Sequence, residues 1–105
     1  MNAVENDIRA LVDKELAAAN ERFPQFHSAH EGWAVILEEL EETKEQLEAV
    51  ERFLSYAWNR IKNDVTAREQ IDTVALFAEN AACEAIQVAA MCKKFLEMEG
   101  KQYDN

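Results

Sequence analysis

Two groups of polar side chains have the residue types and spacing to hold a divalent cation. The segment EELEE, residues 38–42, places four carboxylates within about one and a half helical turns. Glu84 and Gln87 lie three residues apart in the apolar stretch 81–92. Crowded carboxylates repel one another, and a carboxylate among apolar side chains is costly unless a cation, a proton or a metal compensates its charge. Both groups therefore predict a cation site.

A helical projection indicates which carboxylates of the EELEE segment can converge. At ~100° per residue, Glu38 and Glu42 point away from the apolar face of the helix and Glu39 lies at its flank. Glu41 falls away from the other three and is expected to be solvated. The apolar face consists of Trp33, Leu37, Leu40, Leu47, Leu54 and Trp58. Glu38, Glu39 and Glu42 can therefore converge on one volume and are the predicted cation ligands on this helix.

The elements that must position these groups are all predicted to be helical. A first helix spans residues 2–22 and ends because Pro24 disfavours helical angles at Phe23. A second helix begins at Ser28, which fits a capping box with Glu31, and runs to about residue 62. A turn at residues 63–66 leads to a third helix, from residue 67 to about 99, that stops at Gly100.

Composition favours the same fold class. Two glycines and one proline in 105 residues are too few for the many turns of a β-sandwich or an alternating α/β fold. The chain is long enough for one compact domain and too short for two. We therefore predict a single all-α domain over residues 1–105, a helical hairpin preceded by an N-terminal helix.

The register of the predicted hairpin brings the two polar groups together. If the second and third helices turn near Asp64, residues whose numbers sum to about 129 lie side by side, because both helices rise ~1.5 Å per residue. Gln87 then lies level with Glu42, and Glu84 lies less than one turn further on. A competing pair, Glu69 and Asp72, lies ~22 Å from Glu42 in this register and could complete a site only across a dimer.

Charge and hydrophobicity constrain the partners. The net charge is −10, and the scattered basic residues disfavour nucleic-acid binding. Neither a signal peptide nor ~18 uninterrupted apolar residues are evident, so we expect a cytoplasmic protein without a membrane partner. Cys83 and Cys92 are expected to be buried thiols in a reducing compartment. The third helix is apolar on nearly every side between Val74 and Met91, which predicts a homodimer that completes a four-helix or larger bundle.

Hard oxygen ligands without clustered histidine or cysteine favour Mg²⁺, with Mn²⁺ as an alternative. Two other interpretations remain open. The EELEE segment could be a solvated helix face, and Glu84 could pair with an arginine or lysine of a neighbouring helix.

These motifs resemble those of the MazG-like all-α nucleoside triphosphate pyrophosphohydrolases, in particular their short phage- and prophage-type members. The family signature is EExxE on one helix and ExxD on a later one. Residues 38–42 match the first part in full, and Glu84-Ala85-Ile86-Gln87 matches the second with glutamine in place of aspartate. The segments 26–35 and 84–91 are similar to the phage-type subgroup. The resemblance spans about residues 8–98.

The resemblance implies a dimeric, Mg²⁺-dependent enzyme that cleaves a (deoxy)nucleoside triphosphate to a monophosphate and pyrophosphate. By this resemblance, Glu38, Glu39, Glu42 and Glu84 would hold the metal and be the catalytic carboxylates, with Gln87 as a further, uncharged ligand. Because Gln87 brings no negative charge, fewer ions or weaker activity are expected. The alternative is a non-catalytic helical module that binds nucleotides or proteins and keeps a degenerate metal site.

Overall fold

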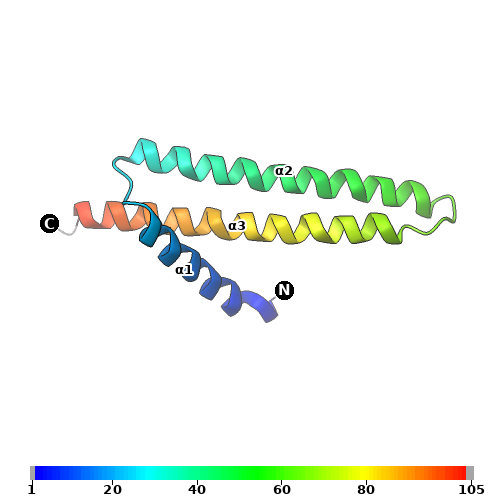
Figure 1. Ribbon diagram of the computed structural model, residues 1–105, viewed down its shortest axis with the longest axis horizontal. Coiled ribbons are helices and arrows are strands. Elements are labelled where there is room, and N and C mark those ends of the chain that lie inside the picture. The colour runs from blue at the N-terminus through cyan, green and yellow to red at the C-terminus, as the bar shows by residue number, and fades with distance from the viewer. Residues whose placement is uncertain (1, 104–105) are drawn as a thin grey trace. The chain divides into compact units, whose positions relative to one another are not determined.

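The computed structural model describes residues 2–103 of the chain and the side chains of residues 3–100. A short 3₁₀ turn, η1 (Asn2–Val4), precedes three α-helices, α1 (Glu5–Arg22), α2 (Ala29–Ile61) and α3 (Arg68–Tyr103) (Figure 1). Residues 2–103 contain no β-strand. The predicted all-α fold class is confirmed.

The chain divides into two compact units. The hairpin unit is Glu41–Glu84, and the three-helix unit holds the residues up to Leu40 and from Ala85 onward. The hairpin unit thus contains the end of α2, the connecting turn and the start of α3. The three-helix unit contains α1, the start of α2 and the end of α3.

In the hairpin unit, aromatic packing and the turn fix the antiparallel pairing. The Phe53 and Phe77 rings stack with centroids 5.6 Å apart, within one residue of the predicted register. The turn is a Schellman motif, in which Val65 N–H donates to Arg60 O (2.9 Å) and Asp64 N–H donates to Ile61 O (3.0 Å). Asp64 adopts the left-handed conformation (φ 56°) that this motif requires and that aspartate tolerates better than most residues.

In the three-helix unit, the connector between α1 and α2 is held against α3. Phe23 is extended (φ −131°, ψ 145°), as the following proline predicts. Gln25 Nε2 donates to Lys94 O at 3.0 Å, and the connector residue Phe26 is buried. On α1, the Asp13 carboxylate pairs with Lys93 of α3 at 2.9 Å. These contacts place the connector beside the last turns of α3.

The predicted cap of α2 is present, with one difference from a full capping box. Glu31 N–H donates to Ser28 Oγ at 3.1 Å. The Glu31 carboxylate accepts a hydrogen bond from His27 Nδ1 at 2.9 Å, so the ring supplies the partner that was expected from the Ser28 backbone. The predicted end of the third helix at Gly100 is wrong, because α3 continues to Tyr103. Gly100 has a negative φ, and glycine inside a helix costs only about 1 kcal/mol.

Much of the apolar face predicted for the second helix is exposed in the single chain. Trp33 is 63% exposed and Trp58 is 60% exposed, and Leu40, Leu47 and Leu54 of the same α2 face are also exposed. The prediction of buried cysteines is likewise wrong: Cys83 is exposed and Cys92 is half-buried, and both thiols are free. The face of α2 that packs within the chain includes Ala49, Ala57 and Thr43, which are buried, and Phe53, which stacks on Phe77.

One helix, α3 over Arg68–Gly100, is long and apolar enough to cross a membrane by length and composition alone. Core helices of soluble bundles pass the same test. Only 11% of its most apolar window is buried in the single chain.

Candidate metal centre

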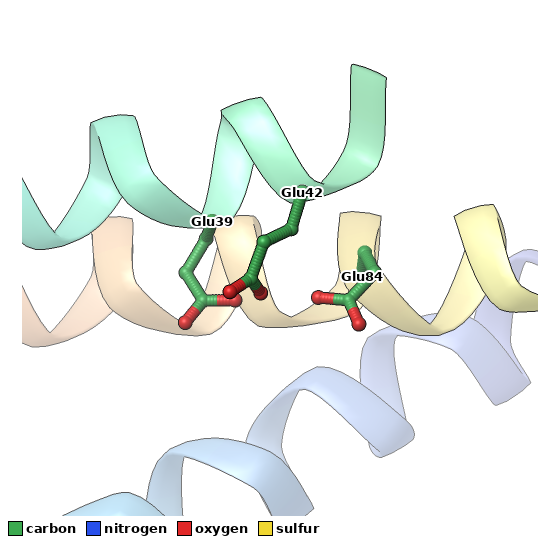
Figure 2. Close-up of side chains that lie close together, drawn as sticks. All are labelled: Glu39, Glu42 and Glu84. Carbon is green, nitrogen blue, oxygen red and sulfur yellow. The ribbon is translucent and has the colours of Figure 1, made fainter. Parts of the chain in front are cut away.

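Three of the predicted carboxylates gather at one place on the α2 and α3 helices. Glu39, Glu42 and Glu84 each present one carboxylate oxygen, and these oxygens lie within 4.8 Å of one another. Figure 2 shows Glu39 and Glu42 extending from α2 toward the Glu84 side chain of α3. Glu42 and Glu84 belong to the hairpin unit, and Glu39 lies one helical turn before Glu42 on the same continuous α2. The local geometry of a helix and a hairpin therefore suffices to bring the set together.

The remaining carboxylates of the EELEE segment lie outside this group. Glu39, Glu42 and Glu84 are all half-buried, whereas Glu38 and Glu41 are exposed. Solvation of Glu41 was predicted from the projection. Glu38 was predicted to be a ligand, but its carboxylate is not among those that the structure brings together. The competing residues Glu69 and Asp72 are both exposed.

The donor set fits a hard divalent cation. Three half-buried carboxylates on separate turns repel one another in the absence of positive charge, and partial removal from water strengthens that repulsion. Mg²⁺ and Mn²⁺ prefer carboxylate oxygens and keep several of their own waters, which the exposed side of the group can supply. The described residues place no histidine or cysteine in the group, which disfavours a site designed for zinc.

A cavity of about 470 Å³ adjoins this region inside the three-helix unit. Glu39 and Gln87 both line it, so two of the predicted site residues face the same space. Its volume lies within the range of roughly 300–1,000 Å³ that small-molecule sites occupy. Apolar side chains from the connector and from both long helices, among them Phe23, Phe26, Val35 and Met91, form much of the remaining wall.

The cavity also contains a residue that the sequence analysis missed. Lys94 lines the wall and is 2% exposed, the most deeply buried charged side chain among residues 3–100. Its ammonium lies 5.2 Å from the centroid of the Phe26 ring. The available sequence signal was its position seven residues after Gln87, which places both residues on one face of a helix.

A further acidic residue of the cavity lining, Glu31, lies at the start of α2. The hydrogen bond from His27 lowers the pKa of the Glu31 carboxyl below its usual value of 4.5, and the Lys94 charge acts in the same direction. Glu31 therefore remains ionised to a lower pH than an unperturbed glutamate. The cavity lining thus contains the Glu31 carboxylate as well as the buried Lys94 cation.

No family model, curated protein or solved structure matches this chain.

Proposed function

We propose that the protein is a metal-dependent nucleotide pyrophosphohydrolase, which converts a (deoxy)nucleoside triphosphate to the monophosphate and pyrophosphate. The observation that supports this proposal most directly is the approach of the Glu39, Glu42 and Glu84 oxygens to within 4.8 Å of one another. The resemblance of residues 38–42 and 84–87 to the EExxE and ExxD motifs gives the reaction class. The adjoining cavity, with apolar walls and a buried cation, provides room for the nucleotide.

Glu39, Glu42 and Glu84 are the proposed ligands of Mg²⁺ or Mn²⁺, and Gln87 can contribute an amide oxygen. When bound, the ion neutralises these carboxylates and the phosphate oxygens of the substrate, so that an anionic substrate can enter an acidic chain. A net charge of −10 would otherwise repel a triphosphate. Exposed Glu38 is proposed to contribute to the local negative potential.

The reaction adds water across one phosphoanhydride bond. The water oxygen bonds to the α-phosphorus, the bond from that phosphorus to the α–β bridging oxygen breaks, and pyrophosphate leaves with the bonding pair. A site carboxylate accepts the proton that the attacking water loses. The rigid helices hold the carboxylates in place before the substrate arrives, and such preorganisation supplies much of the rate enhancement in phosphoryl transfer.

Gln87 favours a second candidate function. Because an amide on the cavity wall replaces the aspartate of the resembled motif, the site has one negative charge fewer and is suited to fewer ions. A nucleotide-binding module that does not hydrolyse its ligand is the alternative. The two functions differ in pyrophosphate release, and a non-catalytic protein-interaction module would lack nucleotide binding as well.

Metal binding is tested by thermal unfolding with Mn²⁺ and with EDTA, using Glu42→Gln and the matched control Glu41→Gln. Mn²⁺ at 100 times its dissociation constant should stabilise the native protein by about 2.7 kcal/mol, or roughly 10 °C in Tm. Glu42→Gln should lose most of this shift, because it removes a ligand charge. In EDTA the free energy of unfolding of the same variant should exceed that of the native protein by about 0.5 kcal/mol, because one of the mutually repelling carboxylates has been removed.

Glu41→Gln removes an equal charge from an exposed neighbour and should keep the Mn²⁺ shift. Equal shifts in all three proteins would place the ion elsewhere, and the absence of any shift in the native protein would refute the metal site.

Catalysis is tested by pyrophosphate release from the common dNTPs, including dUTP and dCTP. We expect turnover that requires Mg²⁺ or Mn²⁺ and falls at least ~100-fold in Glu84→Gln, because a charged ligand of the ion is lost. Unchanged turnover in Glu84→Gln would exclude this placement of the active site. Metal binding without turnover would favour the non-catalytic alternative.

We further propose that the chain acts as a homodimer. The exposed α2 residues Leu47, Leu54 and Trp58 form one apolar stripe within the hairpin unit, and a second copy of the hairpin would complete a four-helix bundle. Glu79 and Glu84, in the middle of α3, make lipid a poor cover for that helix, because carboxylates are costly in a bilayer. A covering protein helix can leave both carboxylates in contact with water or metal.

A further inference from the structure

Lys94 is the most deeply buried charged side chain among residues 3–100, and it lines the cavity of the three-helix unit. Its side chain is 2% exposed, and lysine is almost never so buried without a partner. Its charge helps to lower the pKa of the Glu31 carboxyl, which lines the same cavity. The face of the Phe26 ring, 5.2 Å away, provides a weaker cation–π contact.

Lys94 lines the same cavity as two residues of the candidate metal centre. Lys94, Gln87 and Glu39 line the same space of about 470 Å³, all within the three-helix unit. Gln87 and Lys94 lie on one face of α3, about 10 Å apart along the helix axis at ~1.5 Å per residue. A ligand with one end near Glu39 and Gln87 can therefore extend along this face toward Lys94.

Along α3, the cavity wall carries the neutral amide of Gln87 and the positive charge of Lys94. The other charged side chains of the lining are Glu15, Arg22, Glu31 and Glu39. An aspartate at position 87 would attract a second metal ion to this wall, whereas the amide does not. A phosphate chain at this wall would then receive positive charge from one ion at the carboxylates and from the Lys94 ammonium.

We propose that Lys94 is the protein's cationic contact for the phosphate chain and takes over the neutralising role of a second metal ion. The inference rests on the proposed nucleotide-binding function and deepens it by naming the residue and the ligand group involved. Binding of a phosphate oxygen satisfies the buried ammonium, which explains why a charge is kept where an apolar side chain would pack well. Lys94 would then act mainly on ligand affinity and little on the metal carboxylates.

The experiment compares Lys94→Met with Lys93→Met, which removes the same charge from the adjacent, exposed lysine. Methionine keeps the length of the buried stem, and Lys94→Gln serves as a second variant that keeps a hydrogen-bond donor. Binding of the non-hydrolysable α,β-methylene analogue of dUTP and of inorganic triphosphate is measured by calorimetry with Mn²⁺ present. The Mn²⁺-induced shift in Tm, measured in parallel, reports both folding and the metal site.

Loss of a charge-assisted contact should weaken both ligands about tenfold or more in Lys94→Met and Lys94→Gln. The Mn²⁺ shift should be retained in both variants, and Lys93→Met should bind like the native protein. If the native protein and both Lys94 variants bind equally tightly, the role of Lys94 is refuted while the proposed function stands. If the native protein binds Mn²⁺ but neither phosphate ligand, the nucleotide function and the role of Lys94 are both refuted.

Discussion

At the scale of single residues, the same side-chain type has different roles according to its position on the helix. Glu39 and Glu42 are half-buried and converge with Glu84, whereas Glu38 and Glu41 are exposed. Glu31 gains a histidine partner and becomes a stronger acid. Burial and immediate neighbours, rather than residue type, therefore decide which carboxylates can bind a metal and which remain solvated.

The His27–Glu31 pair gives a prediction at this scale. Because the hydrogen bond from His27 lowers the pKa of Glu31, His27→Ala should raise that pKa toward 4.5. A carboxyl with a lowered folded-state pKa stabilises the fold above pH 4.5, and its contribution is lost as the pH falls through the lowered value. NMR titration of the Glu31 carboxyl measures the change directly.

His30→Ala is the matched control, since His30 is also exposed and lies beside Glu31 in sequence. An equal pKa shift in the His30 variant would show that general charge near the helix start, and not the His27 hydrogen bond, sets the acidity of Glu31.

At the scale of elements, both glycines lie within helices, but the space around Gly32 is crowded and the space around Gly100 is open. A Cβ on Gly32 would lie 2.5 Å from Phe95 Cδ2 and 2.9 Å from Phe26 Cδ2, so α2 approaches these rings closely because residue 32 has no side chain. A Cβ on Gly100 would meet nothing within 4 Å. Gly32 therefore permits packing beside the cavity wall, whereas Gly100 only weakens its helix.

Substituting each glycine by alanine should change stability in opposite directions. Gly32→Ala gains about 1 kcal/mol of helix propensity but should lose ~1–3 kcal/mol to overpacking, for a net destabilisation of about 1 kcal/mol. Gly100→Ala should stabilise the protein by up to ~1 kcal/mol. Urea unfolding monitored by circular dichroism measures both, and a stabilised Gly32→Ala would contradict the close packing described for α2.

At the scale of the whole molecule, the single chain leaves an apolar face that it cannot cover itself. Leu47, Leu54 and Trp58 of α2 lie on the exposed side, whereas Ala49 and Ala57 pack within the chain together with Phe53. Small residues allow close approach inside the hairpin unit, and large residues provide the area that an interface needs. The exposed apolar side of α2 is the basis for the proposed dimer.

Trp58→Glu should therefore convert a dimer to a monomer, because it places a charge in the centre of an apolar interface. Sedimentation equilibrium of the 12.0 kDa chain measures the mass directly. Asn59→Glu adds a charge at the next, also exposed position and should leave the dimer intact. A native protein that sediments as a monomer at all tested concentrations would refute the proposed dimer.

Sequence alone determined the helices and the hairpin register, because capping at Ser28, the proline after Phe23 and the 3.6-residue period are local properties. It also indicated Glu39, Glu42 and Glu84, since helix rise and hairpin geometry suffice to align them. The tertiary structure decided what depends on packing between distant segments: the exposure of Glu38, Cys83 and the apolar α2 face, and the cavity that contains Lys94. The burial of that ammonium depends on contacts of the connector with α3, which no single helix specifies.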